Sequence, residues 1–191
     1  MAVKKGIDWP VGQKLFPQSE RYVVMDVENM NPYSDIIQLA AVEIVDLKIK
    51  KQIFTNIKPL CKRFNPYCAN VHGITLHDVR NERTFAEFSP ELIEFIGSSP
   101  IIAHNRPAEY KSLLFEYEQI KKKFPFYIGN FYCSMKMARD LGLSGKLRVM
   151  AEQVGIKTNH LREEHDALSD TLIASELFIK MQNFRIENNM L

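Results

Sequence analysis

The spacing of apolar residues changes along this chain, and that change constrains the fold more than any other feature. Residues 22–25 form a short, continuous apolar run, which is typical of a buried strand. Two further strand-like segments follow at residues 36–46 and 50–58, and their close spacing favours an antiparallel meander. From residue 85 onward, apolar residues recur mainly at helical spacing. Strands followed mostly by helices predict an α/β domain with a mixed central sheet flanked by helices.

The second half of the chain combines helices with one short strand. Residues 85–96 carry apolar side chains at helical spacing, and Gly97 stands where a C-cap would end that helix. Residues 101–103 are predicted to form a short buried strand, and Pro107 fits the first turn of the next helix. Further helices are predicted at residues 134–141, 146–154 and roughly 166–182.

Length and composition fit one ordinary globular domain. The chain has 191 residues, of which 46% are hydrophobic and 25% are charged. We expect an N-terminal extension at residues 1–20, the domain at residues 21–182 and a short C-terminal tail at residues 183–191. The apolar runs are too short to cross a bilayer, and no stretch near Met1 has signal-peptide length. A cytoplasmic protein without a membrane partner is therefore predicted.

Cysteine spacing and net charge argue against two classes of site. Cys61, Cys68 and Cys133 cannot all pair with one another, and the first two lie too far apart for a CxxC zinc or redox motif. The formal net charge is only +2, whereas wrapping a long duplex draws on many Lys and Arg contacts. A protein that binds only a few nucleotides at a strand end needs fewer Lys and Arg contacts to phosphate. The lysines around residues 48–51 and 121–123 fit such contacts or a solvated surface.

Two carboxylates follow directly after the first predicted strand. Asp26 and Glu28 are two residues apart, so on an extended chain both side chains point to the same side. Adjacent carboxylates repel each other, and a hard divalent cation such as Mg²⁺ removes that conflict by binding oxygen ligands. Taken alone, the pair is weak evidence for a metal site, and a polar strand end explains it better.

A second acidic segment opens the last predicted helix. His165 and Asp166 stand at its start, and Asp170 lies inside it. A neutral histidine can take a proton from water near neutral pH, and a helix is a rigid support for a metal ligand. The alternative is that both aspartates are helix-start carboxylates, which the helix dipole favours.

A third segment lies where the strand at residues 101–103 turns into the next helix. His104 and Asn105 follow the strand, and Glu109 lies in the first turn of the helix. Glu109 by itself is also explained by stabilisation of the helix N-terminus, so its role depends on the other two segments.

Taken in order, these segments resemble the DnaQ-like DEDDh exonucleases, a family with an RNase H-like fold. That family has Asp-x-Glu on its first strand, His-Asn-x-x-x-Asp at a strand-to-helix junction and His-x-Ala-x-x-Asp opening a late helix. Residues 26–28 and 165–170 match the first and last patterns, whereas the middle pattern departs at Glu109, where Asp is usual. Residues 71–75 and 84–87 resemble the connecting segment of proofreading exonucleases. The resemblance covers nearly the whole chain outside the N-terminal extension.

The resemblance implies a metal-dependent 3′→5′ exonuclease that hydrolyses phosphodiesters at the 3′ ends of single-stranded nucleic acid, with DNA favoured over RNA. The implied cofactors are two divalent ions, Mg²⁺ or Mn²⁺. Asp26, Glu28 and Asp170 would hold one ion, with Asp26 bridging to a second ion that lies near Glu109. His165 would be the general base for the attacking water, while the ions offset charge on the attacking and leaving oxygens.

Further partners and alternatives follow from the same resemblance. A polymerase or another DNA-processing complex is the implied protein partner, in proofreading or DNA repair, and a homodimer is left open. Phe131 and Tyr132 are expected either to stack on bases or to pack in the core. His72 and His104 are expected to be structural or peripheral. The alternative function is a catalytically degenerate DEDDh domain that binds nucleic-acid ends or a protein partner, motivated by Glu109.

Overall fold

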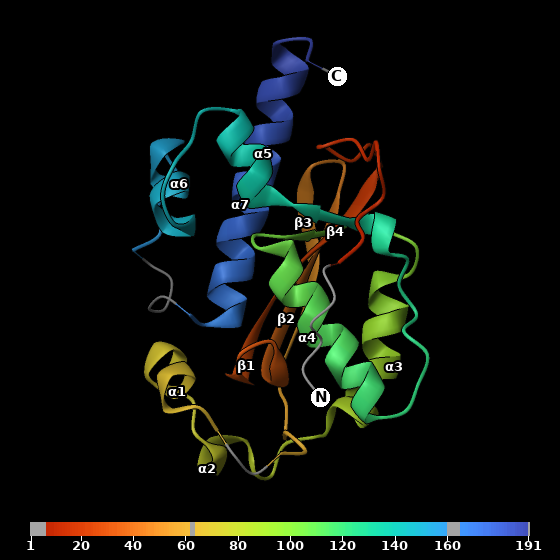
Figure 1. Ribbon diagram of the computed structural model, residues 1–191. Helices are drawn as coiled ribbons and strands as arrows, with labels where there is room; N and C mark the ends of the chain where they lie inside the picture. The colour runs from red at the N-terminus through yellow and green to blue at the C-terminus, as the bar shows by residue number, and fades with distance from the viewer. Residues whose placement is uncertain (1–6, 62–63, 160–164, 191) are drawn as a thin grey trace.

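A mixed β-sheet forms the centre of the molecule (Figure 1). The computed structural model describes residues 7–61, 64–159 and 165–190, so residues 1–6 of the predicted extension and residue 191 of the predicted tail lie outside it. The strands are β1 (Arg21–Asn31), β2 (Ser34–Val45), β3 (Lys48–Asn56), β4 (Ile101–Ala103) and β5 (Phe131–Cys133). Within the described residues these strands pair in the order β3-β2-β1-β4-β5. Pairing is antiparallel from β3 to β1 and parallel from β1 to β5, which confirms the predicted mixed sheet.

Helices cover both faces of this sheet. They are α1 (Pro66–His72), α2 (Leu76–Val79), α3 (Phe85–Ile96), α4 (Arg106–Gln119), α5 (Ser134–Asp140), α6 (Leu147–Gln153) and α7 (Ala167–Glu187). The last three pack on one face, and α3 and α4 pack on the other (Figure 1). Tyr22 and Val24 of β1 contribute to the first core, whereas Val23 and Met25 contribute to the second. Because both faces of β1 are covered, its sequence begins as a continuous apolar run.

Strand β1 is longer than its apolar run predicts. The run ends at Met25, but β2 pairs with β1 as far as Asn31, so the strand continues. Asp26 and Glu28 therefore lie inside β1 and not after it. On its other side, β1 pairs with the short strand β4 only at Val23 and Val24. The acidic part of β1 thus extends beyond the end of its parallel neighbour.

Several short elements were not predicted. Hydrophobic periodicity did not indicate α2, β5 or the 3₁₀ turn η1 (Ile128–Asn130), because each is too short to show a period. It also missed α1, which buries no residue and so has no apolar face. Gly97 does cap α3: its N–H donates to the carbonyl of Ile93 at 2.9 Å. Helix α7 continues to Glu187, beyond the predicted end at residue 182. No helix in the described ranges is long and apolar enough to cross a membrane.

Residues 7–20 lie against the domain without forming a helix or strand. The amide nitrogen of Gln13 donates to the carbonyls of Gly129 and Phe131, at 2.8 and 3.0 Å. Its amide oxygen accepts from Arg106 at 2.7 Å. The guanidinium of Arg106 also lies 3.7 Å from the ring centre of Trp9, which is a cation–π contact. This segment therefore packs against the start of α4, the helix that carries Glu109.

Candidate active site

Asp26 and Glu28 project from β1 on the face that α7 covers, because they alternate with Val27 and share the side of Val24. The side chain of Glu28 is 8% exposed, while Asp26 is partly exposed. Burial raises the pKa of Glu28 to about 8, and the nearby Asp170 adds to the effect. Burial also raises the pKa of Asp26 well above its usual value, with Glu28 as the next cause. The cluster therefore disfavours its own negative charge unless a positive charge is near.

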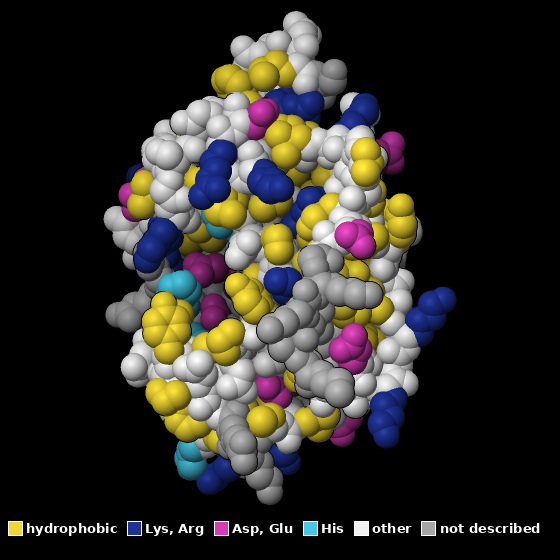
Figure 2. All heavy atoms as spheres, viewed as in Figure 1, with side chains coloured by type: hydrophobic (Ala, Val, Ile, Leu, Met, Phe, Trp, Pro, Cys, Tyr) yellow, Lys and Arg dark blue, Asp and Glu magenta, His cyan; other side chains and the backbone are white. Residues whose placement is uncertain are grey.

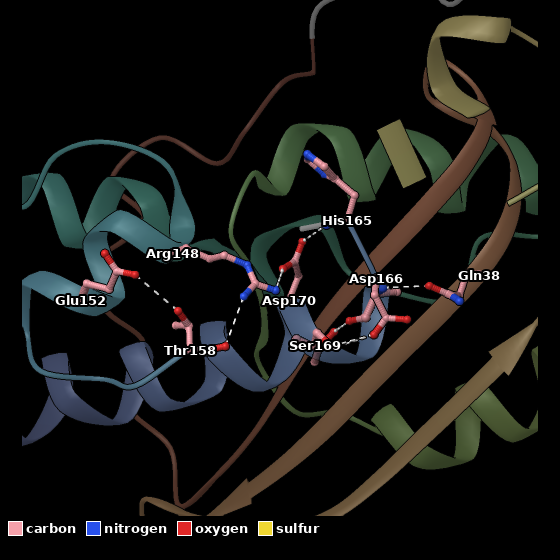
Figure 3. Close-up of polar contacts among 10 residues, drawn as sticks. Gln38, Arg148, Glu152, Thr158, His165, Asp166, Ser169 and Asp170 are labelled. Carbon is pink, nitrogen blue, oxygen red and sulfur yellow. Dashed lines mark hydrogen bonds and ion pairs between the residues drawn. The ribbon is translucent and has the colours of Figure 1, made fainter. Parts of the chain in front are cut away.

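Asp166 and Asp170 have different roles at the start of α7 (Figure 3). Asp166 is the N-cap: its carboxylate accepts hydrogen bonds from the backbone N–H and the hydroxyl of Ser169, at 3.0 and 2.8 Å. One oxygen of Asp170 accepts from the backbone N–H of His165 at 3.1 Å. Its other oxygen lies 3.9 Å from the guanidinium of Arg148. The helix-start interpretation therefore describes Asp166, whereas Asp170 faces other charged groups.

Glu28, His165 and Asp170 meet beside the sheet. Each offers one ligand atom, and these atoms lie within 4.8 Å of one another. His165 adopts φ 69°, in the left-handed region that side chains other than glycine rarely enter. Such strained backbone is commonly retained at functional sites, where the surrounding structure holds it in place. The segments at residues 26–28 and 165–170, which match the family pattern, are thus brought together, although they lie far apart in sequence.

Glu109 enters the cluster from the first turn of α4. It is only 5% exposed, and burial raises its pKa to about 8 against the opposing effect of its own backbone N–H. Its charge also contributes to the raised pKa of Asp26, so the two carboxyl groups are neighbours. Among the described residues, the buried oxygen Oε2 of Glu109 has no hydrogen-bond partner. A buried carboxylate oxygen without a donor fits a place that a metal ion would fill.

These carboxylates and His165 line one cleft of about 480 Å³. Figure 2 shows acidic side chains inside a hollow on this face, with basic and histidine side chains beside them. The cleft also has basic and apolar lining from α5, α6 and the loop between them, which the sequence did not single out. Each of these residues resembles an ordinary surface residue when its helix is considered alone. They are Met135, Arg139, Lys146, Leu147 and Arg148.

The two histidines that were expected to be structural or peripheral differ from each other. His104 lines the cleft, so it is not peripheral, and its Nδ1 lies 3.1 Å from the hydroxyl of Ser134. Burial lowers the pKa of His104 to about 4, which keeps it uncharged near neutral pH. His72 is structural: its Nδ1 accepts from the N–H of Ile74 at 3.0 Å, and its Nε2 lies 3.2 Å from the carbonyl of Asn29.

Phe131 and Tyr132 belong to β5 and to the two cores. Phe131 is fully buried and packs edge-on against Tyr110, with ring centres 5.1 Å apart. Base stacking on Phe131 is therefore wrong, since no base can reach its ring. Tyr132 is partly buried and packs against the core on the α7 side of the sheet. Core packing, the other alternative, accounts for both.

Gln38 holds the start of α7 against the sheet, a role that the sequence did not indicate. It lies on β2 directly opposite Glu28. Its side-chain oxygen accepts a buried hydrogen bond from the backbone N–H of Ala167 at 2.8 Å (Figure 3). Its side-chain nitrogen donates to Asn56 of β3 at 3.2 Å. The amide thereby fixes the first turn of α7, and with it Asp170, beside the carboxylates of β1.

Comparison with known proteins identifies the family. The sequence model of the RNase_T family, described as exonuclease, matches residues 23–178, which is most of the chain. The chain belongs to this exonuclease family. The predicted membership among the DnaQ-like DEDDh exonucleases, with their RNase H-like fold, is confirmed. The prediction of a 3′→5′ exonuclease, a hydrolase of phosphodiester bonds, is confirmed as well.

Relatives of this exonuclease include subunits of a bacterial DNA polymerase. The DNA polymerase III subunit epsilon of Escherichia coli (strain K12) is 27% identical over 176 residues, covering 84% of this chain and 71% of that protein. The corresponding subunit of Aquifex aeolicus (strain VF5) is 30% identical over 168 residues, covering 84% and 79%.

Two solved structures show the same fold. Exonuclease X in complex with 5′ overhanging duplex DNA superposes with a TM-score of 0.69 at 23% identity, covering 85% of this chain and 92% of that chain. The nuclease domain of 3′hExo, a DEDDh family member bound to rAMP, gives a TM-score of 0.70 at 17% identity, covering 86% and 92%.

Proposed function

We propose that this exonuclease removes nucleotides one at a time from the 3′ end of single-stranded DNA, using two divalent ions and His165 as general base. The observation that carries the proposal is the convergence of acidic side chains with His165 in one cleft of a chain of this family. The side chains come from β1, α4 and the start of α7, so the folded domain assembles the cluster. The acidic residues are Asp26, Glu28, Glu109 and Asp170.

The carboxylates would hold Mg²⁺ or Mn²⁺ in two places. Asp26, Glu28 and Asp170 would bind one ion, and Asp26 would share a second ion with Glu109. Oxygen ligands suit these hard cations. Burial raises the pKa values of Glu28 and Glu109, with repulsion from Asp170 adding to that of Glu28, and a cation nearby would favour the ionised carboxylates. When bound, the ions supply positive charge that offsets negative charge on the reacting phosphate and on the attacking and leaving oxygens.

His165 would take the proton of the attacking water through a ring nitrogen. Its backbone N–H donates to Asp170, which ties the position of the histidine to the carboxylate cluster. His104 lines the same cleft, but its pKa of about 4 leaves it with little affinity for a proton near neutral pH. The proposal therefore assigns proton transfer to His165 and not to His104.

Glu109 supports an active enzyme over a degenerate binding domain. Its Oε2 is buried, and within the described residues nothing donates a hydrogen bond to it. Leaving a buried acceptor unsatisfied costs roughly 1–3 kcal/mol, and more for a charged group. A domain that had lost its ions would gain stability by replacing this carboxylate with an apolar side chain. A buried carboxylate in this place is explained if it faces a cation.

The choice of DNA and the cellular setting rest on the relatives. The Escherichia coli and Aquifex aeolicus proteins are named as subunits of DNA polymerase III, which favours DNA as substrate. A polymerase or another DNA-processing complex as partner, and a cytoplasmic location, belong to the same proposal. A homodimer and the domain boundaries at residues 20 and 182 stay predictions.

Strands of DNA and RNA labelled at either end test the proposal in Mg²⁺, Mn²⁺ or EDTA. A 5′-labelled DNA strand should shorten one nucleotide at a time, and a 3′ label should be released as a mononucleotide. EDTA should abolish both reactions, because the carboxylate cluster is inert without cations. Full activity in EDTA, or shortening from the 5′ end, would overturn the proposal. Faster cleavage of RNA would overturn only the preference for DNA.

A further inference from the structure

Basic side chains line the cleft beside the carboxylate cluster. Arg139 lies at the end of α5, Lys146 is the N-cap residue of α6, and Arg148 follows within α6. We name these residues the cation wall. Arg139 and Lys146 are exposed, whereas Arg148 is partly buried. Figure 2 shows basic side chains beside the acidic hollow on this face.

The backbone that presents Lys146 is held in a defined conformation. The side-chain amide of Gln153 bonds to both backbone groups of Ser144: it accepts from the N–H at 3.2 Å and donates to the carbonyl at 2.7 Å. The following residue, Gly145, adopts φ 110°, and a Cβ atom there would lie 2.8 Å from the side chain of Val149. Because the preceding backbone is fixed in this way, Lys146 has a defined position at the edge of the cleft.

Within the cation wall, Arg148 is the residue that reaches the acidic cluster (Figure 3). Its guanidinium donates to the carbonyl of Thr158 at 3.3 Å, and another of its nitrogens lies 3.9 Å from Asp170. The charge of Arg139 helps to lower the pKa of His104, so the two side chains lie near each other. The cation wall therefore meets the acidic cluster through Arg148, while Arg139 lies beside His104 in the same cleft.

We propose that Arg139 and Lys146 bind a backbone phosphate of the substrate strand on the 5′ side of the bond that is cut. This inference rests on the proposed function. Glu28 and Glu109 are buried, so the reacting phosphate belongs deep in the cleft, whereas Arg139 and Lys146 are exposed at its edge. The released nucleotide contributes only the reacting phosphate. A phosphate at the cleft edge therefore belongs to the remaining strand.

The chemistry of the cation wall suits this ligand. Arg and Lys form charge-assisted hydrogen bonds to phosphate oxygens, and such contacts position a strand without reading its bases. The whole chain has a formal net charge of only +2, so binding of a polyanion depends on where its cations lie. Cations next to the carboxylates give the strand a favourable path to a cleft that would otherwise repel it.

Binding of labelled single-stranded DNA in EDTA tests the inference without requiring cleavage. Arg139→Gln and Lys146→Gln should each weaken binding equally for strands of different sequence. Each should also lower the slope of log affinity against log salt by roughly 0.7 to 1, because one phosphate contact is lost. Lys136→Gln is the matched control: Lys136 is exposed on α5 but is not among the cleft-lining residues.

Neutral methylphosphonate linkages then locate the contact. If Lys146 binds one phosphate, the loss of affinity in Lys146→Gln should disappear when that phosphate alone is neutral, and persist with the others. Wild-type protein that binds no strand, or variants that behave like Lys136→Gln, would overturn the inference.

Cleavage in Mg²⁺ distinguishes failure of this inference from failure of the proposed function. If the protein cleaves DNA and the substitutions do not change binding, phosphate binding by the cation wall is refuted and the proposed function stands. If the substitutions weaken binding but the protein does not cleave, the proposed function is refuted and phosphate binding stands.

Discussion

Glu109 is the residue at which this chain departs from the DEDDh pattern, and its burial makes its role measurable. Its pKa is raised to about 8 in the folded protein, above the ordinary value of 4.5. A raised carboxyl pKa means that stability present at low pH is lost as pH rises from about 4.5 to about 8, because over that range the folded state keeps a proton that the unfolded state has released. Glu109 should therefore destabilise the metal-free protein in alkaline solution.

Glu109→Gln should separate stability from catalysis. Glutamine cannot ionise, so in EDTA the variant should gain stability relative to the parent as pH rises from about 4.5 to about 8. Cleavage in Mg²⁺ should fall by more than roughly 10²-fold if the carboxylate is a metal ligand. Urea unfolding and a cleavage assay measure the two effects. Glu109→Asp, which restores the usual family residue, should retain cleavage. Parental cleavage by the glutamine variant would remove Glu109 from the site.

His165→Ala should lower the catalytic rate constant by roughly 10²–10⁴-fold if the imidazole is the general base. Calorimetric titration with Mn²⁺ should then give an unchanged affinity, because the carboxylates remain. A large loss of metal affinity would instead make His165 a ligand, which its position within 4.8 Å of Glu28 and Asp170 also permits. His77→Ala is the control, since His77 is an exposed histidine outside the cleft. It should change neither quantity.

At the scale of elements, the junction between the sheet and α7 depends on one amide. Gln38→Met preserves the length of the side chain but leaves the buried N–H of Ala167 without its acceptor, at a cost of about 1–3 kcal/mol of unfolding free energy. Cleavage should also slow, because the first turn of α7 carries Asp170. Gln38→Glu keeps the acceptor and should recover part of both losses. Gln52→Met, on the exposed surface of β3, should have no effect.

If Gln38→Met unfolds at the parental urea concentration and cuts at the parental rate, the amide does not position α7. Loss of stability with full cleavage would make Gln38 structural only. Recovery by the glutamate variant distinguishes the hydrogen bond to Ala167 from simple packing, because methionine fills a similar volume without an acceptor.

A second junction, between α4 and β2, should respond to pH. Glu116 is 4% exposed, and its carboxylate accepts from the N–H of Ile36 at 2.8 Å. Burial raises its pKa to about 7 from 4.5, so its contribution to stability is lost as pH rises through about 7. Relative to Glu116→Gln, the parent should therefore lose on the order of 3 kcal/mol across this range, since a tenfold change in proton affinity is worth about 1.4 kcal/mol.

Unfolding of both proteins in EDTA from about pH 4 to about pH 8 measures this difference. Glu118→Gln provides the control, because Glu118 is exposed on the same helix. A constant difference between Glu116→Gln and the parent at all pH values would show that Glu116 does not hold a proton in the folded state.

For the whole molecule, metal binding should stabilise the fold, because the ligands come from β1, α4 and α7 and converge only when these elements are packed. An ion that binds only the folded state adds about 2.7 kcal/mol at a concentration one hundred times its dissociation constant. Mg²⁺ or Mn²⁺ should therefore raise Tm, and EDTA should reverse the change. The affinity should increase as pH rises through about 8, since the carboxyl groups of Glu28 and Glu109 must lose protons to bind.

Differential scanning calorimetry with and without each ion measures the effect. Asp170→Asn should abolish most of the metal-induced rise in Tm, while Asp140→Asn, an exposed aspartate at the end of α5, should leave it unchanged. A Tm that is the same in EDTA and in saturating Mg²⁺ and Mn²⁺ would contradict the metal site.

The sequence by itself determined the features that depend on near neighbours. Helix 85–96 and strand 101–103 have the predicted bounds, because the period of apolar residues reports local geometry. Asp26 and Glu28 share a face for the same reason, since alternation along an extended chain is local. The three acidic segments could be recognised because their residue types and spacing carry the family pattern.

Only the tertiary structure decided what depends on distant segments. Strand β1 continues through its acidic residues because β2 pairs with it, and β5 exists as a strand because β4 offers an edge. The hydrogen bond from Ala167 to Gln38 joins positions 129 residues apart, and the basic lining of the cleft comes from helices that follow β5. The burial of Glu109 likewise depends on the packing of segments that are distant in sequence. Local periodicity cannot encode these contacts, because they arise when separately formed elements pack and exclude water between them.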